Sequence, residues 1–229
     1  MNFRSLARIL LCAAAIAGAQ AANAEMVLSQ VIVDFLPGKP LREDIEVWNS
    51  GEERMYVSAE PFRIVAPGTP QEQRVALSLA EDSGLLVSPQ RLVLEPGERR
   101  LIRVAALGGR PQSDAVYRLA IRPVAGAVTA ETDALKVFVG YDALVIVRPE
   151  RVVEDLRAEH GRRTLRLRNM GNTAQELFDG KQCDASGSDC RQLPAKRLYP
   201  SVEWELPLPF DTPVTYKAAV GPTVSERRF

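Results

Sequence analysis

The sequence predicts an all-β protein with two β-sandwich domains in tandem, and three observations support this prediction. The 229 residues include 16 prolines and 15 glycines, and proline exceeds its usual share of about 5%. Short segments with alternating apolar and polar side chains lie between clusters of turn residues. No segment of useful length repeats its apolar residues with the period of a helix. Since 46% of the residues are hydrophobic, the chain has enough apolar material for a core.

The first 24 residues have the layout of a secretory signal peptide. Residues 1–8 contain two arginines and no acid, residues 9–17 are apolar, and Ala22-Asn23-Ala24 is a small-residue cleavage site. The apolar run is shorter than the roughly 18 residues that a membrane span needs. Cys12 raises the alternative of a lipoprotein, but Leu11 stands where a lipobox has a small residue. We expect cleavage after Ala24.

Residues 25–148 are interpreted as the first sandwich. Turn residues such as Asn49-Ser50-Gly51 and Glu95-Pro96-Gly97 separate its extended segments. The expected strands are residues 27–34, 41–48, 55–59, 63–65, 85–87, 91–94, 100–105, 116–122 and 135–147. Their number and spacing are typical of a β-sandwich.

Residues 149–229 are interpreted as a second, smaller sandwich. Arg148-Pro149 is the predicted junction, because proline restricts the backbone there. The expected strands are residues 163–168, 197–199, 202–206 and 214–220. Residues 158–161, which include the single histidine His160, are interpreted as a polar turn.

Removal of the leader leaves two cysteines, Cys183 and Cys190. In an exported protein, two cysteines so close together predict a structural disulfide. A loop of this length would stabilise the fold by about 2.5 kcal/mol on chain-entropy grounds. The alternative, a metal or redox pair, lacks further ligands, since His160 lies in a different segment.

Several function classes find no support in the residues. The 29 basic and 29 acidic residues balance, so no basic surface indicates nucleic-acid binding. The arginines at 162, 163, 166 and 168 alternate with leucines and are interpreted as a solvated strand face. Neither a G-x-S-x-G elbow nor a glycine-rich phosphate loop is present. We therefore expect no enzyme, metal or cofactor, although a hydrolase whose carboxylates pair only in space stays open.

Two groups of segments resemble the periplasmic pilus chaperones of the chaperone–usher pathway. Three segments resemble the first domain of that family. They are V-S-P-Q-R-L-V-L-E-P-G-E at residues 87–98, Y-R-L-A-I-R-P at residues 117–123, and Arg148-Pro149. Three later segments are similar to the second domain of its colonisation-factor (alternate, α-type) branch. They are N-M-G-N-T at residues 169–173, D-G-K-Q-C at residues 179–183, and L-P-A-K-R at residues 193–197. Together the two groups extend over nearly the whole mature chain.

The resemblance implies two immunoglobulin-like domains that form an L with a cleft between them. It also implies a periplasmic location, no catalysis, and two kinds of partner, pilus subunits and an outer-membrane usher. Such chaperones lend the last strand of their first domain to a subunit that lacks one strand, and then hand the subunit to the usher. Nucleic acid and membrane insertion are not expected.

Leu135, Val137 and Val139 are the predicted donor residues, with Lys136 and Phe138 on the other face of the strand. Strand donation needs an edge strand with alternating apolar side chains. Three buried aliphatic side chains would contribute about 4–9 kcal/mol before ordering costs. Without the resemblance, the same residues favour an internal strand of the first sandwich.

The sequence departs from the family at the expected anchor for the subunit's carboxylate. The family places an arginine on the first strand and a lysine on the donor strand, and this sequence has Gln30 and Leu144 at the aligned positions. A neutral glutamine donates a weaker hydrogen bond than a charged group. Alternative anchors on neighbouring strands are Arg118, Arg122 and Lys136.

Residues 124–133 form a short segment without cysteine, unlike the family branch with a long disulfide-bearing loop there. The alternative function is a periplasmic or secreted immunoglobulin-like binding module, or an adhesin-type fimbrial protein. A pilin is less favoured, because pilins of this class have a single incomplete domain.

Overall fold

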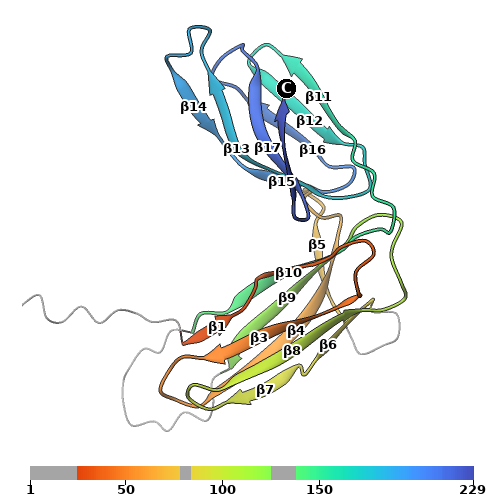
Figure 1. Ribbon diagram of the computed structural model, residues 1–229, viewed down its shortest axis with the longest axis vertical. Coiled ribbons are helices and arrows are strands. Elements are labelled where there is room, and N and C mark those ends of the chain that lie inside the picture. Colours follow the sequence, from red (N-terminus) through yellow and green to blue (C-terminus); the bar gives the residue numbers. More distant parts are fainter. Residues whose placement is uncertain (1–24, 78–83, 125–137) are drawn as a thin grey trace, which may run out of the picture.

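The computed structural model describes residues 25–77, 84–124 and 138–229. In this part of the chain, every regular element is a β-strand. Figure 1 shows the strands in two sandwiches that lie end to end and are inclined to one another. The prediction of an all-β fold with two sandwich domains is therefore confirmed.

The first sandwich contains strands β1 to β10. Their bounds are β1 Met26–Leu28, β2 Ile32–Phe35, β3 Arg42–Asn49, β4 Met55–Val65, β5 Gln73–Ala76, β6 Leu85–Ser88, β7 Arg91–Leu94, β8 Arg99–Ala106, β9 Ala115–Val124 and β10 Tyr141–Val147. One sheet has the order β1-β3-β8-β6, and the other has the order β2-β10-β9-β4-β5 with β7 paired to β4. Side chains from both sheets alternate inward and form one core, as expected of a sandwich.

The second sandwich contains strands β11 to β18. Their bounds are β11 Leu156–Gly161, β12 Thr164–Asn169, β13 Gln175–Cys183, β14 Cys190–Leu193, β15 Lys196–Leu198, β16 Glu203–Pro207, β17 Val214–Val220 and β18 Thr223–Arg228. One sheet has the order β11-β12-β16, and the other has the order β14-β13-β17-β18 with β15 paired to β13. Tyr216 is fully buried in its core, and burial raises the pKa of the phenol to about 12.

Four sequence interpretations need correction. The strand expected at residues 135–147 begins at Tyr141 in the described part of the chain, because residues 138–140 belong to no strand. The segment 27–34 is two strands, because the chain leaves the sheet of β3 after Leu28 and joins β10 at Ile32. Pro61 does not interrupt β4, because β7 pairs with residues up to Ser58 and β5 pairs from Phe62 onward. The missing N–H of Pro61 thus falls in the gap between two partner strands. Residues 158–161 are part of strand β11, not a turn, and His160 is opposite Leu165.

The hydrophobic core of the second sandwich continues onto the first. Four side chains on the outer face of the β2-β10-β9-β4-β5 sheet, Ile64, Val116, Leu144 and Ile146, join the cluster around Leu165, Leu177 and Val202. Loop residue Gly68 also approaches the second sandwich, since a Cβ built there would lie 2.9 Å from Cδ2 of Tyr199. Apolar packing therefore connects the two domains.

Candidate functional site

Strand β10 lies at the centre of the candidate site because both of its faces are buried. Ala143, Val145 and Val147 belong to the core of the first sandwich. Leu144 and Ile146 point the other way, into the cluster shared with the second sandwich. Residues 143–147 are therefore buried on both faces of the strand.

The edge of β10 changes its surroundings at Leu144. Strand β2 runs parallel to β10 and pairs with residues 144–147 only, and the Leu144 N–H donates to the Val31 carbonyl at 2.9 Å. Strand β9 pairs with all of β10, from Tyr141 to Val147, along its other side. In the described part of the chain, no strand pairs with residues 141–143 on the β2 side. The edge is open because the N-terminal segment is divided between the two sheets. Its β1 pairs with β3 in the opposite sheet, and only β2 pairs with β10.

The predicted donor residues lie just before this open edge. Leu135, Lys136 and Val137 fall outside the described residues. Val139 is 53% exposed, and the neighbouring Phe138 is 39% exposed. Val139 has the parity of Tyr141 and Ala143, so along an extended strand it shares their face.

The predicted anchor positions, Gln30 and Leu144, are not register partners. The Gln30 amide donates to the Asp44 carbonyl on β3 at 3.5 Å. The register partner of Leu144 across the parallel pair is instead Ile32, which is 47% exposed. Leu144 itself is only 3% exposed. Leu144 and its neighbour across the parallel pair, Ile32, are therefore both uncharged and apolar.

Two of the alternative anchors, Arg118 and Arg122, lie on β9 and point to the outer face of the sheet. Arg122 is bound to Glu60 of β4, with its Nη2 donating to Oε2 at 2.6 Å. Arg118 is the cross-strand partner of both Leu144 and Phe62, which places it beside the shared apolar cluster. Its guanidinium is 3.8 Å from the carboxylate of Asp142. The sequence interpretation did not include Asp142 or its second partner Arg74, whose Nη2 donates to Asp142 Oδ1 at 2.7 Å.

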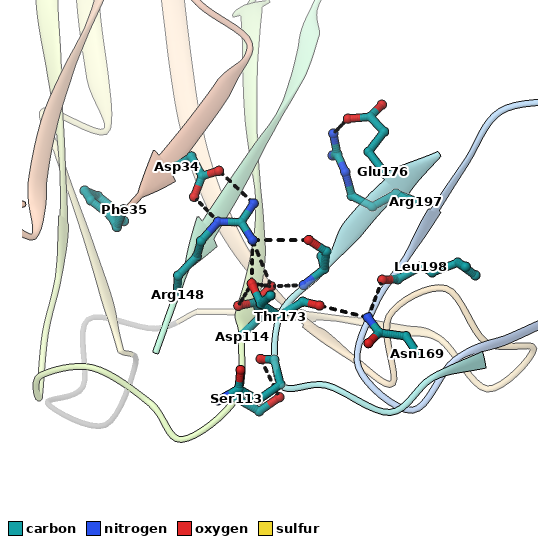
Figure 2. A network of polar contacts seen from close by, with 12 residues as sticks. Asp34, Phe35, Ser113, Asp114, Arg148, Asn169, Thr173, Glu176, Arg197 and Leu198 are labelled. Atoms are coloured by element: carbon teal, nitrogen blue, oxygen red, sulfur yellow. Dashed lines mark hydrogen bonds and ion pairs between the residues drawn. The ribbon is translucent and has the colours of Figure 1, made fainter. Parts of the chain in front are cut away.

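A buried polar network lies where β10 ends and the second sandwich begins (Figure 2). The guanidinium of Arg148 donates from Nε and Nη2 to the two carboxylate oxygens of Asp34, at 2.7 and 2.8 Å. Its Nη1 donates to the Thr173 hydroxyl and to the Ala174 carbonyl in the second sandwich. With 4% of its surface exposed, Arg148 is held by partners on both domains.

Asp114 completes this network. Its carboxylate accepts hydrogen bonds from the Thr173 hydroxyl at 3.0 Å and from the Ala174 N–H at 2.6 Å. Burial raises the pKa of the Asp114 carboxyl above its ordinary value, against the opposing effects of the Ala174 N–H and the Arg148 charge. The sequence interpretation identified only the junction at Arg148. An arginine directly after a strand buried on both faces was the available signal, because such a charge requires acidic partners.

The loop at residues 169–174 fits against the first domain. The Asn172 side chain donates to the carbonyls of Gln112 and Arg151, at 3.1 and 2.9 Å. A Cβ at Gly171 would lie 2.2 Å from the Val153 carbonyl oxygen, so only glycine fits there. Asn169 holds the loop from inside, with its amide donating to the carbonyls of Thr173 and Leu198. The segment that resembled the family thus forms part of the domain interface.

The predicted disulfide is confirmed. Cys183 and Cys190 are bonded, and they are directly opposite each other in the β13–β14 pair. The β13–β14 hairpin, which carries the disulfide, lies at the end of the second sandwich away from β10 (Figure 1). It is therefore part of the framework and not of the candidate site.

The outer face of the β2-β10-β9-β4-β5 sheet has a hollow of about 800 Å³ at the Tyr56 end of β4. Its apolar row consists of Val93, Tyr56 and Val124 on three adjacent strands. Within the described residues, no three or more His, Cys, Asp or Glu side chains are grouped so that they could hold a metal ion. Nor does any helix there have the length and apolar character needed to cross a membrane.

Comparisons with known proteins give a consistent result. No protein-family model matches the sequence. A relative from Escherichia coli, named as a CFA/I fimbrial subunit, is 25% identical over 195 residues, which is 80% of each chain. The class 5 fimbriae chaperone CfaA has 23% identity and a TM-score of 0.66, over 89% of this chain and 98% of that one. This chain has the fold of the fimbrial chaperones.

A second structure supports the same assignment. It is the Salmonella enterica complex of the SafA pilin with the SafB chaperone, with 15% identity and a TM-score of 0.65. The match covers 92% of this chain and 98% of the chain compared. The resemblance to pilus chaperones inferred from the sequence is therefore confirmed, and the colonisation-factor relatives agree with the branch named there.

Proposed function

We propose that this protein is a periplasmic chaperone that binds fimbrial subunits and delivers them to an outer-membrane usher, without catalysis. The observation that carries the proposal is the open edge of β10 at residues 141–143. Unpaired backbone N–H and C=O groups at such an edge can accept a further strand from another chain. The fold shared with chaperones that form complexes with a pilin or a tip adhesin supports this role.

In this proposal, residues 135–139 extend β10 and supply the apolar side chains that fill the subunit's groove. Val139 is the donor residue within the described part of the chain, and more than half of its side chain is exposed. Since an exposed apolar side chain gains free energy when a partner covers it, Val139 can contribute to binding without contributing to the fold. Leu135 and Val137 are proposed for the same role.

The contacts between the two domains support the proposal further. Arg148 joins Asp34 to Thr173, and the cluster around Leu144 joins the apolar surfaces of the two sandwiches. In this proposal, these contacts orient the open edge relative to the second sandwich. Pre-organisation of this kind lowers the ordering cost of binding a partner.

Co-expression with the fimbrial subunit encoded beside this gene tests the proposal. We expect a 1:1 complex that survives purification and a subunit that is degraded when this protein is absent. Val139→Asp should abolish the complex, because it places a charge at the donor face. Val224→Asp on β18 is the matched control, since Val224 is also 53% exposed but lies in the second sandwich.

Two outcomes would contradict the proposal. If Val139→Asp and Val224→Asp retain the complex equally, the donor assignment is wrong. If the subunit is equally abundant when expressed alone and nothing co-purifies, an immunoglobulin-like binding module with another partner becomes the better hypothesis.

The proposed location requires removal of the leader. Residues 1–24 lie outside the described residues, and Glu25 is the first residue that the structure describes. Mass spectrometry of the protein from a periplasmic extract should give a chain that begins at Glu25. A chain that retains residue 1 would contradict the proposed cleavage.

A further inference from the structure

Two arginines from different strands converge on one carboxylate beside the open edge of β10. Nη2 of Arg74, on β5, is 2.7 Å from Oδ1 of Asp142, and Nε of Arg118, on β9, is 3.8 Å from Oδ2. Arg118 also donates from Nη1 to the Asp142 backbone carbonyl at 3.3 Å. Asp142 thus has one guanidinium on each of its carboxylate oxygens.

The long reach of Arg74 is supported by an aromatic ring. The guanidinium carbon of Arg74 lies 4.1 Å from the ring centroid of Phe62 on β4. Arg74 therefore crosses the outer face of the sheet in an extended conformation, held by a cation–π contact, until it meets Asp142 on β10. Phe62 is thus a second partner for the guanidinium of Arg74 besides Asp142.

Among the described residues, the charges at this position do not balance. Arg74 and Arg118 share the carboxylate of Asp142, whereas the neighbouring Arg122 pairs with Glu60 at 2.6 Å. The side chains of Arg74, Arg118 and Asp142 are 39%, 35% and 47% exposed, so another anion can reach them. Guanidinium groups bind carboxylates through paired hydrogen bonds, which makes a second carboxylate the ligand that best fits this pair.

We propose that Asp142 is a resident carboxylate that occupies the Arg74–Arg118 pair in the free protein and leaves it when a carboxylate of the bound strand arrives. This inference rests on the proposed function, because it assumes that a partner strand pairs with the open edge at residues 141–143. Asp142 lies on that segment, so a strand added there brings its own groups within reach of both arginines. Arg74 and Arg118 then anchor the partner, in the absence of charge at Ile32 and Leu144.

The exchange has a functional consequence. In the free protein, Asp142 neutralises one of the two arginines, which lowers the attraction for unrelated anions. A partner carboxylate must compete with Asp142, so only a ligand that also pairs with the β10 edge gains enough free energy to displace it. The resident carboxylate thus makes anchoring depend on strand pairing.

Replacement of the Asp142 carboxylate, which competes with the partner's carboxylate, tests the inference. Asp142→Asn should tighten binding of the fimbrial subunit by about three- to fivefold, the size expected for one exposed ion pair. Arg74→Ala should weaken binding by a similar factor, and more strongly when Asp142 is already Asn. High salt should reduce both effects, since the groups are partly exposed.

Glu60→Gln is the matched control. It removes the same charge from the same sheet face but releases Arg122 instead of the Arg74–Arg118 pair. Binding is measured by titration calorimetry with the purified subunit. Equal tightening by Glu60→Gln and Asp142→Asn would indicate general electrostatic attraction and would overturn the inference.

A synthetic peptide with the subunit's last residues identifies the source of the carboxylate. If the partner's terminal carboxylate is the ligand, amidation of the peptide should remove the gain produced by Asp142→Asn. If an acidic side chain is the ligand, its replacement by the amide should remove the gain instead. Should Asp142→Asn and Arg74→Ala leave subunit binding unchanged, the inference fails while the proposed function stands. Absence of any subunit binding by the unmodified protein would refute the proposed function itself.

Discussion

The guanidinium of Arg148 forms a two-pronged ion pair with the carboxylate of Asp34 at the end of β10, where only 4% of the arginine surface is exposed. The pair joins the first strand of the β10 sheet to the last strand of the first sandwich. The remaining nitrogen of Arg148 continues to Thr173 and Ala174 in the second sandwich. A single buried cation thus connects three segments that are far apart in the sequence (Figure 2).

Arg148→Ala should destabilise the protein strongly. Removal of one partner leaves the carboxylates of Asp34 and Asp114 buried without their cation, which typically costs about 3–5 kcal/mol. Because the lost contacts connect the domains, we expect the two sandwiches to unfold in separate transitions. Urea denaturation followed by tryptophan fluorescence and circular dichroism measures both effects. Arg157→Ala, which breaks an exposed pair with Asp155, should leave the melting temperature nearly unchanged, and an equal loss in both variants would contradict this account.

The buried carboxyl of Asp114 should make stability depend on pH in a particular direction. Burial raises the pKa of Asp114 above its ordinary value of 3.8 in the folded protein, so the folded state holds this proton more tightly than the unfolded state. The resulting stabilisation is fully present below pH 3.8 and is lost as the pH rises through the folded-state pKa. Relative to Asp114→Asn, the free energy of unfolding of the unmodified protein should therefore fall as the pH rises.

Glu98 gives a control of opposite sign. A hydrogen bond from the Glu95 N–H and a pair with Arg100 lower the pKa of Glu98. Relative to Glu98→Gln, the unmodified protein should gain stability as the pH rises above the folded-state pKa. Urea titrations of both variants from pH 3 to pH 7 measure the two slopes, and slopes of the same sign would contradict the assignment for Asp114.

The disulfide should stabilise the second sandwich without affecting subunit binding. Replacement of Cys183 and Cys190 by serine removes the crosslink between β13 and β14, at an expected loss of about 2.5 kcal/mol. The melting temperature should fall in the double variant and in the reduced protein alike. Since the crosslink is remote from β10, the complex with a fimbrial subunit should still form. Unchanged melting after reduction would contradict the stabilising role.

The sequence predicted most of the strands that bury one face, but it missed β13, which alternates buried and exposed side chains. In β9, the alternation of Tyr117, Leu119 and Ile121 with Arg118, Ala120 and Arg122 identified both the strand and the core face. Strand β11 was missed because nearly all of its side chains are exposed, so it has no alternation to detect. Strand β18 was missed for the same reason. Edge strands of this kind are recognised by their backbone partners, which the sequence does not display.

The site was predicted less completely than the fold. The proposed donor residues came from local apolar alternation together with the resemblance to the pilus chaperones. The meeting of Arg74, Phe62 and Asp142 depends on the register of β5, β4, β9 and β10, which are separated by long stretches of chain. Likewise, the change of sheet between β1 and β2 makes Ile32 the neighbour of Leu144. The sequence analysis took Gln30 from an alignment of the first strand and Leu144 from a count back from Arg148-Pro149, and neither step gives the register between β2 and β10.

Ile32 and Leu144 should respond differently to the same substitution. They are register partners on one face, but Ile32 is 47% exposed and Leu144 is 3% exposed. Leu144→Lys should destabilise the protein by at least the roughly 2–5 kcal/mol of a buried leucine truncation, because the ammonium group would lie among Ile64, Val116 and Ile146. Ile32→Lys should change the free energy of unfolding by about 0.5 kcal/mol or less, as exposed substitutions usually do. It should also tighten subunit binding, because it adds a cation beside the Arg74–Arg118 pair. Thermal denaturation and subunit titration of the two variants test both expectations, and equal stability of the two variants would show that Leu144 does not hold the domains together.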